Sequence, residues 1–159
     1  MKTIIIYSTK YGCAGELAYL IQKELKGECK IVNVMKSSVP PLNDYDTVIL
    51  GGSLYIGRIQ KQLKKYVNEH LDTLLTKKVG LFLSAGDPKA AENEVVRKNV
   101  FPKALIEHAV AFDVLGYAYK FDKMGFFDRF IVKRVAGLSE NVTEYYENRI
   151  KAFAEALTR

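Results

Sequence analysis

The chain has 159 residues, of which 48% are hydrophobic and 26% are charged, and this composition excludes an intrinsically disordered protein. No apolar run approaches the roughly 20 residues of a membrane span, and the two cysteines, Cys13 and Cys29, form no CxxC pair, which excludes a disulfide framework or a zinc site. The formal net charge of +6 favours an anionic partner. We expect one domain over residues 1–159.

Apolar segments alternate with helical patterns along the first half of the chain. A run of β-branched residues predicts a buried strand, and apolar residues at intervals of three and four predict helices. The elements expected here are a strand at Lys2–Ser8, a helix with Leu17, Leu20, Ile21 and Leu25 on its apolar face, strands at Lys30–Val34 and Thr47–Gly52, and a helix through Leu63, Val67, Leu71 and Leu74.

The second half continues the alternation and ends in two amphipathic patterns. The last of them has Asn141 and Glu144 as a capping pair. The elements expected here are a strand at Lys78–Ser84, a helical stretch at 89–108 interrupted before Pro102, a strand at Val110–Tyr119, a helix through Phe127, Phe130, Ile131, Val135 and Leu138, and a helix through Val142, Tyr146, Ile150, Phe153 and Leu157.

Five apolar strands that alternate with helices predict an α/β fold with a parallel sheet covered on both faces. In such sheets ligands bind beyond the carboxyl ends of the strands, where the winding order reverses. The loops that follow the first, third and fourth predicted strands, at 8–14, 52–58 and 84–89, are therefore the places to expect a site.

The loop between the first strand and the first helix reads STKYGCA and suits a phosphate. The start of a helix presents unpaired N–H groups and partial positive charge, and Gly12 lets the main chain approach an anion. A capped turn without a ligand explains the loop equally well. The phosphate-binding motif GxxxxGK[ST] is absent. The motif GxGxxG is also incomplete, because position 17, where its last glycine would stand, is Leu.

Cys13 stands at the start of the first predicted helix, where a helix dipole would lower the pKa of its thiol. A phosphatase loop of the form Cys-x5-Arg is excluded, because Tyr19 occupies the position of the arginine. We expect no catalytic side chain and no metal site.

Three segments, IIIYSTKYG, VILGGSLYIG and FFDRFIVKRVAG, resemble the flavodoxin family. They are most similar to the flavodoxin-domain group that includes the menaquinone-dependent protoporphyrinogen dehydrogenases of bacteria. The resemblance spans nearly the whole chain. It implies a flavodoxin-like three-layer sandwich, with a five-stranded parallel sheet in the order 2-1-3-4-5 and noncovalent FMN.

The resemblance also implies where FMN would bind. The first loop would surround the phosphate, and the loops after the third and fourth strands would flank the isoalloxazine ring. The candidate cofactor-binding residues are Ser8, Thr9, Lys10, Tyr11, Gly12, Cys13, Ala14, Ser53, Leu54, Tyr55, Ile56, Gly57, Ser84, Ala85, Gly86 and Asp87.

Three departures from the family pattern bear on function. Ala14 stands where the family usually has a threonine whose hydroxyl meets the phosphate, and losing such a bond costs about 1.5–3 kcal/mol, which favours weak FMN binding. Tyr55 can stack on one face of the ring, but 84–89 offers no aromatic residue for the other face. Flavodoxins are typically acidic, whereas this chain is basic.

These features leave three functions open: an electron carrier, an oxidoreductase that passes electrons from protoporphyrinogen to a quinone, and a flavin-free basic binding module. The first two need a redox partner protein or a quinone. Nucleic acid is not an expected partner, because aromatic residues do not interleave with the cations of Arg58–Lys65.

The segment Phe126–Leu138 combines phenylalanines with Arg129, Lys133 and Arg134. This pattern fits a helix that lies on an anionic membrane surface, and it also fits a helix that covers the sheet. The first apolar run, Ile4–Tyr7, is too short for a signal peptide. We therefore expect a cytoplasmic protein, and the first interpretation of Phe126–Leu138 would place it on the inner face of the membrane.

Overall fold

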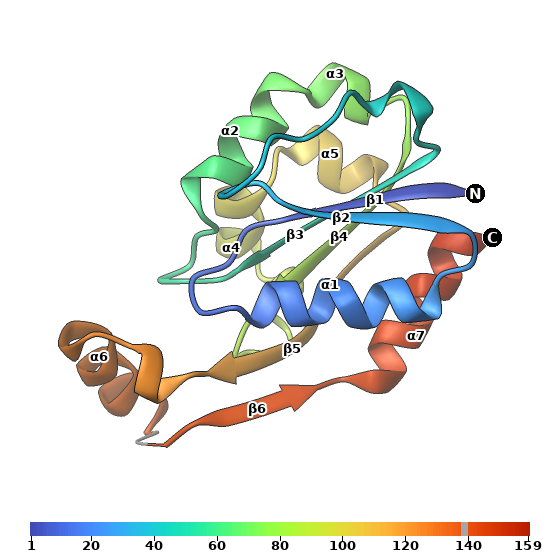
Figure 1. Cartoon of the computed structure of the whole chain (residues 1–159). Coiled ribbons are helices and arrows are strands. Elements are labelled where there is room, and N and C mark those ends of the chain that lie inside the picture. The colour runs from blue at the N-terminus through green and yellow to red at the C-terminus, as the bar shows by residue number, and fades with distance from the viewer. Residues whose placement is uncertain (138–139) are drawn as a thin grey trace.

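The computed structural model describes residues 1–137 and 140–159, and these form a three-layer α/β/α sandwich (Figure 1). The described strands make one sheet in the order β2-β1-β3-β4-β5-β6, in which the first five strands are parallel and β6 runs antiparallel to β5. The strands are β1 (Lys2–Tyr7), β2 (Glu28–Asn33), β3 (Thr47–Ser53), β4 (Lys78–Ser84), β5 (Ala111–Tyr119) and β6 (Val142–Tyr145).

Helices cover both faces of the sheet, and one lies beyond its edge (Figure 1). Helices α1 (Cys13–Glu24) and α7 (Glu147–Thr158) share one face. The other face carries α2 (Lys61–Glu69), α3 (Leu71–Leu74), α4 (Glu94–Val100) and α5 (Lys103–His108). The helix α6 (Phe126–Ala136) projects beyond the carboxyl ends of the strands instead of covering the sheet, so the covering-helix interpretation of this segment is wrong.

The strands are apolar on both sides because each face of the sheet has its own core. Ile4 and Ile6 point toward α2–α5, whereas Ile5 points toward α1 and α7, and all three are fully buried. This alternation explains why the first strand is continuously apolar. Each of these helices is too short or too polar to cross a membrane, and that holds for every helix in the described ranges.

The five predicted parallel strands are present in the predicted order, but the sheet has a sixth, antiparallel strand that the sequence analysis missed. Val142–Tyr145, expected to begin the last helix, forms β6 and pairs with β5 from Tyr119 back to Gly116. Valine, threonine and tyrosine suit a strand, and the edge of β5 supplies the hydrogen-bonding partner that a local pattern does not reveal. The proposed capping pair is absent, because the side-chain oxygen of Asn141 accepts a bond from the N–H of Asp122.

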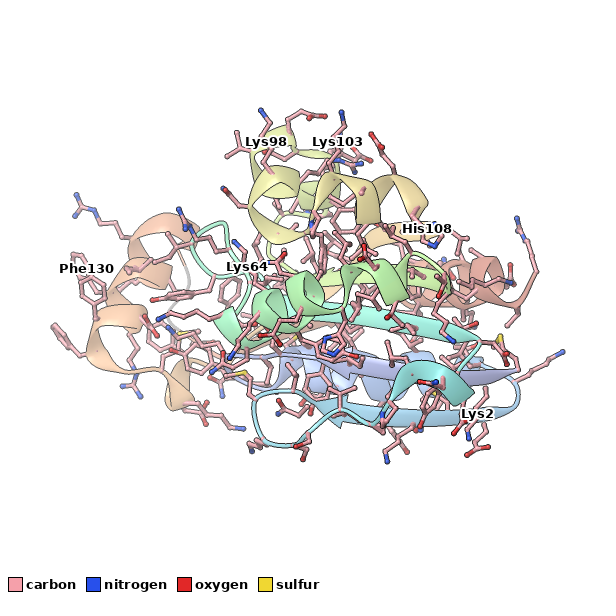
Figure 2. All side chains as sticks on the ribbon, turned by 90° about the horizontal axis from the view of Figure 1, so that it is seen from above. Lys2, Lys64, Lys98, Lys103, His108 and Phe130 are labelled. Atoms are coloured by element: carbon pink, nitrogen blue, oxygen red, sulfur yellow. The ribbon has the colours of Figure 1, made fainter. Side chains whose placement is uncertain are left out.

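Two predicted helices are interrupted. The helix through Leu63 and Leu74 breaks at His70, whose ring stacks on that of Tyr66 with centroids 4.2 Å apart. The stretch 89–108 contains a short 3₁₀ turn at Ala90–Glu92, followed by α4 and α5. Lys98 and Lys103 protrude from these two helices, well away from Phe130 on the outer side of α6 (Figure 2).

Candidate functional site

A pocket of about 540 Å³, its solvent-filled mouth included, opens at the carboxyl ends of β1, β3 and β4. This is the end of the sheet at which the order of the strands predicts a ligand. All three predicted loops contribute to its wall: Lys10, Tyr11 and Cys13 from the first, Ser53, Leu54 and Tyr55 from the second, and Ser84, Ala85 and Gly86 from the third.

The remaining candidates lie outside the lining of this pocket, namely Ser8, Thr9, Gly12, Ala14, Ile56, Gly57 and Asp87. Ser8 is fully buried, and its hydroxyl donates to the side-chain oxygen of Gln60 at 2.7 Å. Ala14 is the second residue of α1, and its side chain is fully buried in the core. Its main-chain N–H is therefore the group that it can offer to a ligand. Ile56 points to solvent and is 69% exposed.

The first loop turns sharply at Gly12, whose φ of 99° is left-handed. Its N–H donates to the hydroxyl of Thr9 at 2.8 Å, and that hydroxyl lies 3.2 Å from the hydroxyl of Ser53. The first N–H groups of α1 have no acceptor within the helix. The turn therefore leaves main-chain donors at the positive end of a helix of 12 residues, as an anion site requires.

The second loop is a tight turn held by two bonds between the main chains of Tyr55 and Arg58, at 2.8 and 3.1 Å. Ile56 and Gly57 between them both have positive φ, 49° and 72°, which is typical of a type I′ turn. An isoleucine rarely adopts this conformation. The main-chain N–H of Leu54 donates to the main-chain oxygen of Ser84 at 2.8 Å, and this bond connects the second loop to the third.

Strand β5 also contributes to the wall of the pocket. Tyr117 and Tyr119 line the pocket with their rings 5.6 Å apart, and Tyr119 lies so close to Gly86 that a β-carbon there would be 2.3 Å from the tyrosine hydroxyl. The sequence interpretation missed these two tyrosines. Their spacing of two residues, at the carboxyl end of the fifth predicted strand, is the signal that would have found them.

Helix α6 closes the pocket through Asp128, with Met124 and Val132 beside it. The Asp128 carboxylate lies 3.2 Å from the ammonium group of Lys10 and accepts hydrogen bonds from the hydroxyls of Tyr11 and Tyr55. We call these four residues the Asp128 clasp. It joins α6 to the first and second loops, and the side chain of Asp128 is only 14% exposed.

The charge of the Asp128 clasp follows from its contacts. Burial by itself would raise the pKa of Asp128, but the hydrogen bonds from Tyr11, Tyr55 and Lys10, together with the charge of Lys10, hold that pKa below its usual value. Burial and the bond to Asp128 raise the pKa of Tyr11. At neutral pH the carboxylate is therefore ionised and the Tyr11 hydroxyl keeps its proton.

The expectation that the helix dipole lowers the pKa of Cys13 is wrong. Burial raises the pKa of this thiol to about 11, and the smaller effect of a hydrogen bond with Ser84 does not reverse the shift. Within the described residues, no cluster of three His, Cys, Asp or Glu side chains is placed to bind a metal.

Native-state labelling tests the cysteine result. Burial also raises the pKa of Cys29 to about 11, so we expect both thiols to react with Ellman's reagent at neutral pH at least about a hundredfold more slowly than a free thiol. The same protein in urea, where both thiols are exposed, is the control. A fast-reacting thiol in the folded protein would contradict the expectation.

Residues 4–145 match the family described as "Flavodoxin domain". The chain is 22% identical to protoporphyrinogen IX dehydrogenase [quinone] of Escherichia coli strain K12 over 91% of this chain and 83% of the relative. It is 28% identical to an uncharacterized protein of Methanocaldococcus jannaschii over 100% of this chain and 99% of the relative. The solved structure of a flavodoxin from Streptococcus pneumonia TIGR4 is 12% identical, with a TM-score of 0.57 over 99% of this chain and 98% of that structure. The match over most of the chain shows that the protein belongs to the flavodoxin-domain family.

Proposed function

We propose that this chain is an FMN-binding redox protein that accepts and passes on electrons. The observation that carries the proposal is the meeting of the three loops in one pocket at the carboxyl end of the sheet. The family match and the flavodoxin structures with the same fold support it. Residues 1–159 would act as one domain in the cytoplasm, with a quinone or a redox protein as partner.

The residues present fit the phosphate and the aromatic ring of FMN. The first turn of α1 offers main-chain donors for a phosphate, and Lys10 adds a positive charge. Tyr55 and Tyr119 both line the pocket and would flank the ring. Tyr119 would thus supply the second aromatic side chain that residues 84–89 do not contain.

When bound, FMN would supply the electron or hydride chemistry, and the protein would position it and adjust its potential. The hydroxyls of Ser53 and Ser84 are nearly buried at the pocket and can orient a polar ring edge. The ionised Asp128 disfavours added negative charge nearby, whereas Lys10 favours it. Both side chains would therefore influence the reduction potential.

A second candidate function is the oxidation of a protoporphyrinogen with a quinone as acceptor. The extent of the match to the Escherichia coli relative favours it, and so do the apolar side chains of Met124 and Val132 in the pocket wall, since both molecules are apolar. Steady-state oxidation of protoporphyrinogen IX by the FMN-loaded protein with menaquinone would distinguish this enzyme from an electron carrier, which would show no turnover.

Titration with FMN and with riboflavin tests the main proposal. If the first loop holds the phosphate, FMN should bind at micromolar concentration, and riboflavin, which lacks the phosphate, about a hundredfold more weakly or worse. Quenching of flavin fluorescence measures both affinities, and the absorbance spectrum of the purified protein shows whether flavin is already bound.

The same titration at several salt concentrations separates a pocket from a charged surface. Binding in the pocket should persist at high salt, whereas binding to a basic patch should be screened away. Equal affinities for FMN and riboflavin would contradict a phosphate site in the first loop. No binding at micromolar FMN would favour the flavin-free basic module.

A further inference from the structure

The outer surface of α6 is apolar and exposed. Phe126, Phe127 and Phe130 are 89%, 69% and 55% exposed, and Figure 2 shows Phe130 on the outer side of the helix, pointing away from the body of the protein. Exposing three neighbouring phenylalanines is unfavourable in water, and a patch of this kind commonly marks a surface that binds a partner.

Helical spacing separates this surface from the pocket. At about 100° per residue, Phe126, Phe130 and Lys133 lie along one side of α6, and Phe127 lies near Arg134 at the border of that side. Asp128 and Val132 fall on the opposite side, and both line the pocket. One helix therefore carries a pocket face and a solvent face.

The charges of α6 are divided in the same way. Its single acidic residue is Asp128, and that carboxylate points inward to Lys10. Lys133 and Arg134 are exposed on the outer side, and Lys123 is exposed just before the helix. Arg129 is excluded from this count, because it donates to the main-chain oxygens of Phe121 and Asp122. The outer face thus combines phenylalanines with cations and has no acid of its own.

We propose that this outer face, Phe126, Phe127, Phe130, Lys133 and Arg134, docks on an anionic lipid bilayer. Phenylalanine rings enter the boundary between headgroups and acyl chains, and lysine and arginine beside them attract anionic headgroups. A protein partner would need a groove shaped for the rings, whereas a bilayer needs only this composition. Docking does not require FMN, so it can hold or fail independently of the redox proposal.

The position of the pocket gives docking a consequence, and this step rests on the proposed redox function. The helix that would lie on the bilayer also forms part of the pocket wall, through Asp128 and Val132, and Met124 just before the helix lines the pocket as well. Docking would then hold the pocket within one helix diameter, roughly 10 Å, of the lipid, and so close to an apolar electron acceptor dissolved there.

Vesicle co-sedimentation of the full chain, without added FMN, tests the docking. We expect binding to vesicles of phosphatidylcholine with phosphatidylglycerol, and much weaker binding to phosphatidylcholine alone. Replacing the three rings in Phe126→Ser/Phe127→Ser/Phe130→Ser should lower the partition coefficient by tenfold or more, as expected for apolar groups of about this size. Lys133→Gln/Arg134→Gln, which removes two cations, should lower it by about 25-fold, and only on the anionic vesicles.

Two matched controls make the experiment specific. Tyr19→Ser/Val95→Ser/Val110→Ser removes three exposed apolar side chains from other surfaces, and Lys98→Gln/Lys103→Gln removes two cations on α4 and α5. Both should bind vesicles like the unaltered protein, apart from a weak effect of net charge.

Three results would overturn the docking proposal. The first is unaltered vesicle binding by the triple phenylalanine variant, and the second is equal loss in the control variants. The third is a dimer in sedimentation velocity that the triple phenylalanine variant converts to a monomer, because the face would then be covered by a second copy of the chain.

Discussion

Replacing Phe82 by alanine is expected to lower the free energy of unfolding by about 3–5 kcal/mol. The Phe82 ring is fully buried beneath α1 and α7, where it meets Phe153 edge to face with centroids 6.3 Å apart. Alanine would leave a cavity that this packed layer cannot close. Urea unfolding measures the loss, and Phe126→Ala is the matched control, because a ring that is 89% exposed should cost less than about 0.5 kcal/mol.

The same ring explains why Gly51 is a glycine. Gly51 pairs with Phe82 across β3 and β4, and a β-carbon at Gly51 would lie 2.1 Å from the ring. Gly51→Ala alone should destabilise by about 1–3 kcal/mol through overpacking. In a Phe82→Ala background the added methyl enters the vacated space, so its cost should nearly vanish. Additive losses in the double variant would contradict this packing.

The second large effect is expected at Gly12. Gly12→Ala forces a side chain into left-handed backbone, which costs roughly 1–2 kcal/mol, although its β-carbon would meet nothing within 4 Å. The strain should also displace the main-chain donors of the first loop. We expect the Kd for FMN to rise by about tenfold or more, whereas the already weak affinity for riboflavin should hardly change.

Gly125→Ala is the matched control for this prediction. Gly12 and Gly125 both precede the first residue of a helix, and both have open space at the β-carbon. Gly125 has a φ of −71°, which alanine adopts easily. Both variants lose the glycine cap, so their difference isolates the left-handed conformation. Equal effects on FMN affinity and on unfolding would show that the shape of the first loop is unimportant.

The parallel part of the sheet was predictable because strands that are buried on both faces consist of consecutive apolar residues, which are visible in the sequence. Lys78–Ser84 was predicted with its observed bounds, and the other four parallel strands differ at their ends by one or two residues. Strand β6 was missed because Val142, Tyr146 and Ile150 recur every four residues, as in a helix. The pairing of Val142–Tyr145 with β5 outweighs that local pattern.

The first three loops of the site were predictable from their places after strands, but their partners were not. Asp128 lies 118 positions after Lys10 in the sequence, and only the folded chain places the two charges 3.2 Å apart. The spacing of the phenylalanines correctly predicted a helix at α6. Spacing alone does not determine whether the apolar face of a helix packs on the sheet or is exposed to solvent. Leu138, the last residue of that predicted surface, lies outside the described residues.

The Asp128 clasp has a kinetic consequence. One carboxylate contacts the first loop through Lys10 and Tyr11 and the second loop through Tyr55, so a movement of α6 away from the pocket breaks its contacts with both loops together. Widening the mouth of the pocket by moving α6 is therefore a single cooperative step. The observed association rate of any ligand admitted this way levels off at high concentration, at the rate constant of that opening.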